Sequence, residues 1–67
     1  MKPFVIDVFS VGSDNEIQKR RYESDSFESA IHMMKIRSDL PGTSRIVISR
    51  RIGGNGRQIS KMKVWSR

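Results

Sequence analysis

The first hydrophobic segment of the chain has apolar side chains on both of its faces. Within residues 3–11, one set of alternating positions is Phe4, Ile6 and Val8, and the other includes Val5, Phe9 and Val11. A period of two residues is the pattern of a β-strand, and apolar groups on both sides indicate that both faces are covered. We therefore predict a central strand over residues 3–11. We expect its single carboxylate, Asp7, to face a lysine or arginine of a neighbouring strand.

The next segment is much more polar. Residues 12–15, Gly-Ser-Asp-Asn, are types favoured in tight turns. Residues 16–24 then carry only Ile17 and Tyr22 as main apolar groups. Charged side chains on an edge strand discourage pairing with other chains. The pattern predicts a hairpin whose second strand, residues 16–24, lies at the edge of the sheet.

A helical pattern follows. Apolar residues recur at i, i+3, i+4 and i+7, which places them on one face of a helix: Phe27, Ala30, Ile31 and Met34. Asp25 is suited to accept hydrogen bonds from the first helical N–H groups, and Glu28 follows it at capping-box spacing. Pro41 cannot continue the helix. We predict one helix near residues 26–38, with His32 off its apolar face and exposed.

Two more strands are predicted over residues 43–52 and 57–65, joined by a glycine-rich stretch. A three-residue loop, Gly54-Asn55-Gly56, with a glycine in the left-handed conformation is a common hairpin connection. This loop pairs Ile48 with Met62 and Ile46 with Val64 on one face. A four-residue loop instead mixes lysines with isoleucines on both faces. Because a one-residue slip inverts the faces of a strand, we prefer the register with the cleaner partition.

These elements predict an α+β fold of ββαββ order, a four-stranded antiparallel sheet with one helix packed on one face. The core is expected between the helix and the sheet. Its expected members are Phe27, Ile31, Met34, Ile6, Ile46, Ile48, Met62 and Val64.

Length and composition narrow the class of protein. A chain of 67 residues has room for one domain, residues 1–67. It has no cysteine, which excludes a disulfide and fits a reducing compartment. Its single histidine has no carboxylates at ligand spacing, so we expect no metal and no cofactor. No apolar run reaches the roughly 20 residues of a membrane span. We therefore expect a soluble, cytoplasmic protein with no membrane partner.

The distribution of charge along the chain is the most informative feature of the composition. The formal net charge is +6, but residues 1–40 are nearly balanced, whereas residues 41–67 contain no acid. The basic residues of that second part are Arg45, Arg50, Arg51, Arg57, Lys61, Lys63 and Arg67. A block of one sign on a folded element favours a polyanion or an acidic surface as partner.

The outer face of the last hairpin is the predicted binding surface. Its residues are Arg45, Arg51, Arg57, Lys61, Lys63 and Trp65. Cations neutralise phosphates, and an exposed indole can stack on a base. We expect the side chains of Arg51 and Lys61 to be solvated. In the alternative interpretation, Trp65 is a core residue that caps the end of the sheet.

Two further basic features are weaker. Consecutive glycines between Arg51 and Arg57 can cradle a phosphate, but an ordinary hairpin turn explains the same residues. The cluster of residues 19–21, Lys-Arg-Arg, lies in a strand, so its side chains alternate between faces. We interpret that cluster as a solvated edge.

The segment ESDSFESAIHMM, residues 23–34, follows a predicted hairpin and precedes LPGTSRIVISRR, residues 40–51. This layout resembles that of small phage-encoded inhibitors of bacterial RNA polymerase, which have a hairpin, one capped helix and a returning strand. The resemblance covers residues 4–51, and the second hairpin departs from it. It implies a protein that acts on a host protein, and no site residue is carried over.

Little in the sequence favours an enzyme. Ser24, Ser26 and Ser29 have no general base at an identifiable spacing, and Asp7 is an isolated carboxylate. We expect a non-enzymatic module that binds nucleic acid, DNA or RNA. The alternative is an inhibitor or adaptor that docks on an acidic surface of a host protein such as RNA polymerase. A structural role as a homodimer is a third hypothesis.

Overall fold

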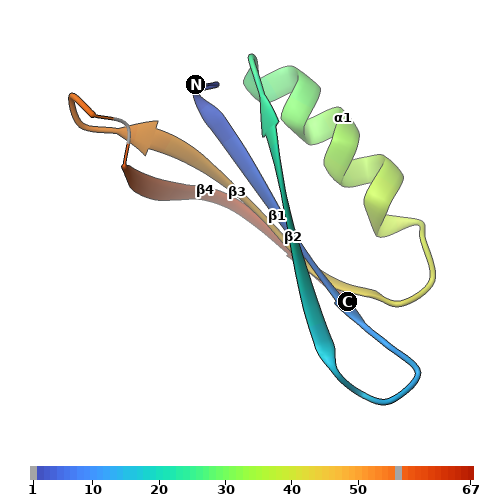
Figure 1. Ribbon diagram of the computed structural model, residues 1–67. Coiled ribbons are helices and arrows are strands. Elements are labelled where there is room, and N and C mark those ends of the chain that lie inside the picture. Colours follow the sequence, from blue (N-terminus) through green and yellow to red (C-terminus); the bar gives the residue numbers. More distant parts are fainter. Residues whose placement is uncertain (1, 56) are drawn as a thin grey trace.

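The computed structural model describes residues 2–55 and 57–67 and has the predicted ββαββ order. Strands β1 (Phe4–Val11), β2 (Ile17–Ser24), β3 (Thr43–Ile52) and β4 (Gln58–Ser66) form one antiparallel sheet, and α1 (Phe27–Ser38) packs on one face (Figure 1). The strand order is β2-β1-β3-β4. The prediction that β1 is central and β2 is an edge strand is therefore confirmed. Within the described ranges, no helix is long and apolar enough to cross a membrane.

The core between α1 and the sheet is smaller than predicted. Ile6, Ile46 and Ile48 are fully buried, and Met34 is nearly so. Val8 and Ala30 complete this cluster, and Ile31 packs against it only partly buried. Phe27 is 36% exposed because it lies in the first turn, where it contacts Phe4 with 6.0 Å between ring centroids. The predicted burial of Phe27, Met62 and Val64 is therefore wrong, and Ile31 is buried only in part.

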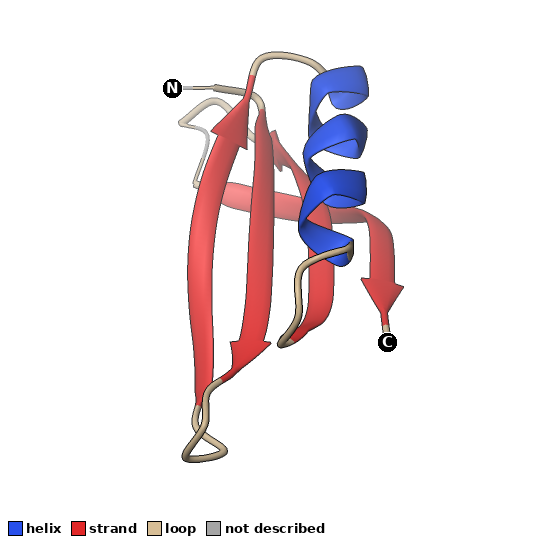
Figure 2. Cartoon of the chain, turned by 90° about the vertical axis from the view of Figure 1, so that its right-hand side faces the viewer, coloured by secondary structure: helices blue, strands red, loops and turns tan. Residues whose placement is uncertain are grey.

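The second hairpin follows the predicted register only as far as a β-bulge. Ile52 pairs with Gln58 and Ser49 with Lys61, as expected, but Ile48 pairs with Lys63 instead of Met62. Met62 is thus an extra residue in β4, and every later residue of the strand changes face. Consequently the predicted pairs Ile48–Met62 and Ile46–Val64 are wrong. Figure 2 shows that β4 bends sharply along its length, as a bulged strand does.

Two local predictions have simple outcomes. The helix is capped by Ser26 and not by Asp25, since the Ser26 side chain accepts a hydrogen bond from the Ser29 N–H at 3.1 Å. In the last hairpin, Gly53 has a φ of +85°. Gly56, for which a left-handed conformation was one option, lies outside the described residues.

The sheet is covered on both sides near its centre. Val5, Asp7, Val47 and Ser49 are buried although they lie on the face opposite α1. Long side chains cover this face: Arg21 bonds to Asp7, and Arg51 on β3 reaches Glu23 on β2. Because β1 lies between β2 and β3, the Arg51–Glu23 link spans β1 at the level of Val5, the register partner of Glu23. The aliphatic stems of these arginines thus cover a face of the sheet on which no second helix of the described chain packs.

Candidate binding surface on the open face of the sheet

The face of the sheet opposite α1, called here the open face, carries most of the charge that the strands display. Side chains of a strand alternate, so the positions between the core residues point to this face. Lys19, Arg21 and Glu23 on β2 lie there, opposite Phe9, Asp7 and Val5 of β1. Arg45, Arg51 and Lys61 lie there from β3 and β4. Among the described strand residues, the open face therefore has five basic and two acidic side chains.

Both acids of the open face are neutralised by arginines. Arg21 Nε and Nη2 donate to the two oxygens of Asp7 at 2.8 and 3.2 Å. The hydrogen bond to Asp7 raises the pKa of Arg21 above its ordinary value, with smaller electrostatic contributions from Asp7 and Glu23. Arg51 pairs with Glu23 and also donates from Nε to the Lys2 carbonyl at 3.0 Å. These two arginines therefore hold strands together.

Three cations of the open face have no acidic partner. Within residues 2–55 and 57–67, no carboxylate pairs with Lys19, Arg45 or Lys61. All three are exposed. The Arg45 guanidinium lies over the Phe9 ring, 5.8 Å from its centroid, which restrains its position by a cation–π contact. The three residues come from three different strands and form an uncompensated positive surface.

The structure brings together only part of the predicted site. Arg45, Arg51 and Lys61 share the open face, and Arg57 is exposed in the loop at the end of the hairpin. Lys63 and Trp65 do not, since they pair with Ile48 and Ile46 and therefore share their face, the side of α1. Their predicted position is wrong because of the bulge at Met62. The prediction that Arg51 is solvated is wrong too, because only 17% of its side chain is exposed.

Trp65 is a partly buried residue that packs against the core cluster. The Arg67 guanidinium lies 5.8 Å from its ring centroid and donates to the Ser38 carbonyl at 3.0 Å. These contacts attach the end of β4 to the end of α1. The position agrees with the alternative interpretation of Trp65 as a cap on the sheet, and it takes the indole away from the predicted binding surface.

The glycine-rich loop has the contacts of a turn. The Arg57 N–H donates to Asn55 Oδ1 at 3.0 Å, an Asx-type bond over two residues. Arg51, expected at one end of a phosphate cradle, is instead bonded to Glu23 and Lys2. The turn interpretation is therefore favoured.

The cluster of residues 19–21 divides between faces, as expected. Lys19 and Arg21 are on the open face, while Arg20 pairs with Val8 and points to the side of α1. There it lines a pocket together with Arg37 of α1. The sequence analysis missed this pair, because only the packing of α1 on the sheet brings residue 37 near residue 20.

Within the described part of the chain, no group of three or more His, Asp or Glu residues is placed to hold a metal ion. Ser24 and Ser26 serve the helix start, where the Ser24 hydroxyl donates to the Ser26 carbonyl at 3.0 Å. Compared with protein families, with curated proteins and with solved structures, the chain gives no match.

Proposed function

We propose that this chain is a nucleic-acid-binding module that uses the open face of its sheet. One observation carries the proposal: the two acids of that face are paired with Arg21 and Arg51, so Lys19, Arg45 and Lys61 remain as uncompensated cations on three strands. Such a surface attracts a polyanion and releases its counterions on binding. Arg57 extends the same charge into the exposed hairpin loop.

The aromatic residues near these cations indicate which part of a nucleic acid the surface would contact. Phe9 is the only aromatic residue that the described strands place on the open face, and Arg45 already lies over its ring. Trp65 is on the other face. Base stacking, which needs a free ring face, therefore has little support, and lysine and arginine contacts to phosphate dominate. We propose binding that depends on backbone charge and depends little on base sequence.

A face-resolved titration tests this proposal. Lys61→Gln is compared with Lys35→Gln, which removes the same single charge from an exposed lysine of α1. Lys61→Gln should bind a labelled oligonucleotide clearly more weakly than Lys35→Gln does, and the double variant Arg45→Gln/Lys61→Gln more weakly still. Equal weakening by the two single variants would show that net charge, and not the open face, governs binding.

A second function is favoured by a different observation. Ile59, Met62 and Val64 are 40%, 48% and 45% exposed along β4, one of the two edge strands of the sheet. Apolar groups beside cations suit a protein interface with an acidic rim. We propose as the alternative an inhibitor or adaptor that docks on an acidic host protein such as bacterial RNA polymerase, in line with the resemblance of residues 4–51.

Nuclease treatment distinguishes the two proposals. The tagged protein is used to capture partners from a bacterial lysate, with and without nuclease. Loss of all partners after nuclease favours nucleic acid, whereas a protein that stays bound, and is released when Val64 is replaced by Asp, favours the inhibitor.

A further inference from the structure

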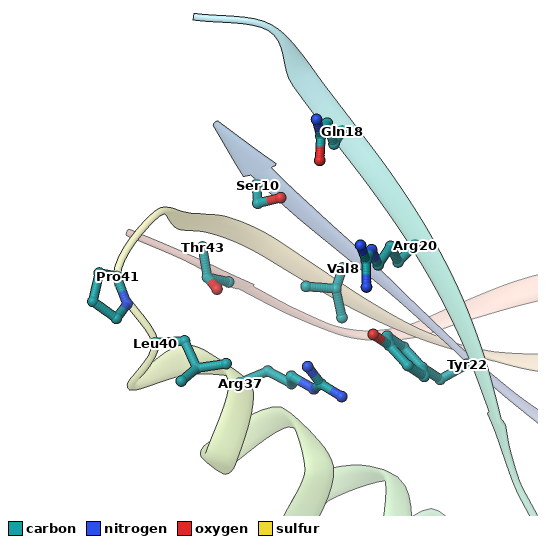
Figure 3. Close-up of a pocket in the computed structure, with 9 residues that line it drawn as sticks. All are labelled: Val8, Ser10, Gln18, Arg20, Tyr22, Arg37, Leu40, Pro41 and Thr43. Atoms are coloured by element: carbon teal, nitrogen blue, oxygen red, sulfur yellow. The ribbon is translucent and has the colours of Figure 1, made fainter. Parts of the chain in front are cut away.

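A second basic site lies on the other side of the sheet. Side chains of β1 and β2, the end of α1 and the start of β3 line a partly open pocket of about 220 Å³. Figure 3 shows Arg20 from β2 and Arg37 from α1 extending toward the same space beside Tyr22. The pocket is separate from the open face, because Arg20 is the register partner of Val8, a member of the core cluster under α1.

Both arginines of this pocket lack an acidic partner. Within the part of the chain that the structure describes, no carboxylate pairs with Arg20 or Arg37, and no acid is among the lining residues. Two guanidinium groups that face one cavity repel each other unless an anion lies between them. The pocket thus holds a charge of +2 with no counter-charge of its own.

One of the two guanidinium groups is held in place. Arg37 lies over the Tyr22 ring, 4.6 Å from its centroid. Tyr22 is itself partly buried and packs against the core. This contact restrains a side chain that is otherwise long and flexible, so less conformational freedom is lost when Arg37 bonds to a ligand.

The rest of the lining adds neutral donors and an apolar floor. Ser10, Gln18 and Thr43 contribute hydroxyl and amide groups. Thr43 is buried, and the buried Val8 lies on the same face as an apolar neighbour. Donors therefore approach the cavity from β1, β2, β3 and α1, which means from several directions and not from one plane.

We propose that this pocket binds a phosphate-class oxyanion, either free phosphate or a terminal phosphate monoester. Arginine is suited to phosphate because its rigid fork of donors matches the oxygen atoms. A carboxylate has two oxygens in one plane, which a single arginine can bind through two parallel hydrogen bonds. A tetrahedral oxyanion has more oxygens, directed to different sides, and uses the donors of Arg20, Arg37 and the hydroxyl groups together.

The test uses the full chain and inorganic phosphate as probe. Amide NMR spectra are recorded during titration at constant ionic strength, and acetate is titrated in parallel. Saturable shifts that are centred on Ser10, Tyr22 and Thr43, with acetate binding at least about tenfold more weakly, are expected. Shifts of equal size around Lys61, or equal affinity for acetate, would overturn the proposal.

Matched variants assign the binding to the arginine pair. Arg20→Gln should weaken phosphate binding about tenfold or more, since a hydrogen bond to a charged group is lost. Arg45→Gln removes the same group from the open face and should leave phosphate affinity unchanged. Arg20 is exposed, so Arg20→Gln should fold. Arg37→Lys is a second test of the pair, because it keeps the positive charge but loses the forked guanidinium donors. Equal affinity of Arg20→Gln and the parent would contradict the assignment.

The source of the phosphate is distinguished in the same spectra. A 5′-phosphorylated dinucleotide is compared with its 5′-hydroxyl form. Tighter binding of the phosphorylated form than of inorganic phosphate assigns the pocket to a nucleic-acid end, and equal or weaker binding assigns it to free phosphate. The site is independent of the open face, so its failure leaves the proposed function untouched.

Discussion

The guanidinium of Arg21 meets both carboxylate oxygens of Asp7 across two neighbouring strands, at 2.8 and 3.2 Å. The Asp7 side chain is only 9% exposed, whereas that of Arg21 is 43% exposed. The acid is therefore buried in the central strand and depends on one partly solvated arginine for its charge balance. A carboxylate in such a position is costly when it is left alone.

We predict that Arg21→Ala lowers the free energy of unfolding by about 1–3 kcal/mol. Water reaches the exposed part of the site and replaces some of the lost bonds, so the loss stays below that of a fully buried pair. Because its bond to Asp7 raises the pKa of Arg21, the guanidinium stays charged at neutral pH, and its contribution to stability is lost as pH rises through that raised value. Urea unfolding measures the effect. Lys19→Ala, an exposed neighbour on the same face, is the control and should change stability by less than about 0.5 kcal/mol.

Arg51→Ala should also be destabilising, by about 1–3 kcal/mol, because the side chain is 17% exposed and ties β3 to Glu23 and to the Lys2 carbonyl. Lys61→Ala removes an exposed cation near it and should be close to neutral. Thermal melting of the two variants compares them directly. Equal melting temperatures would show that Arg51 is a solvated side chain after all.

Met34→Ala should cost about 2–5 kcal/mol, since Met34 is 4% exposed at the centre of the helix–sheet contact. A domain of this size has about 3–5 kcal/mol in total, so much of the population should unfold at room temperature. Phe27→Ala should cost less, because Phe27 is 36% exposed. Circular dichroism in increasing urea measures the loss of stability in both variants. A larger loss for Phe27→Ala than for Met34→Ala would show that the buried face of the helix is assigned wrongly.

Trp65→Ala should lower the melting temperature and leave oligonucleotide affinity nearly unchanged. The indole packs against the core and under Arg67 on the side of α1. Its removal should cost about 2 kcal/mol, below the roughly 3–5 kcal/mol of a fully buried tryptophan. Val64→Ser, next to it but on the open face, is the stability control. A stable Trp65→Ala variant that binds nucleic acid poorly would contradict the register of β4.

The sequence was sufficient to predict the elements and their order, because periodicity and turn residues are local signals. Alternation in residues 4–11 predicted the central strand, and the isolated Asp7 correctly implied a basic partner. The position of one extra residue was not predictable in this way. A bulge at Met62 preserves the loop-proximal register and inverts the faces of Val64 and Trp65, so half of the strand agrees with a regular hairpin and half does not.

The candidate sites show the same division. Strand alternation and the loop register were sufficient to place Arg45 and Lys61 on one face, and both lie on the open face as predicted. The pairing of Arg51 with Glu23 could not be predicted, because Glu23 is distant in sequence and meets Arg51 only across β1. The pocket of Arg20 and Arg37 was missed for the same reason, as it depends on how α1 lies on the sheet.

The most direct test of the proposed function is a titration of a labelled random oligonucleotide with the unmodified protein, starting at about 50 mM salt, where electrostatic binding is strong. Lys19, Arg45, Lys61 and Arg57 together can neutralise three to four phosphates. The logarithm of the association constant for duplex DNA should therefore fall with the logarithm of salt concentration with a slope of about −3. No detectable binding to single- or double-stranded DNA or RNA at the lowest salt would contradict the proposal and leave the acidic host protein as the expected partner.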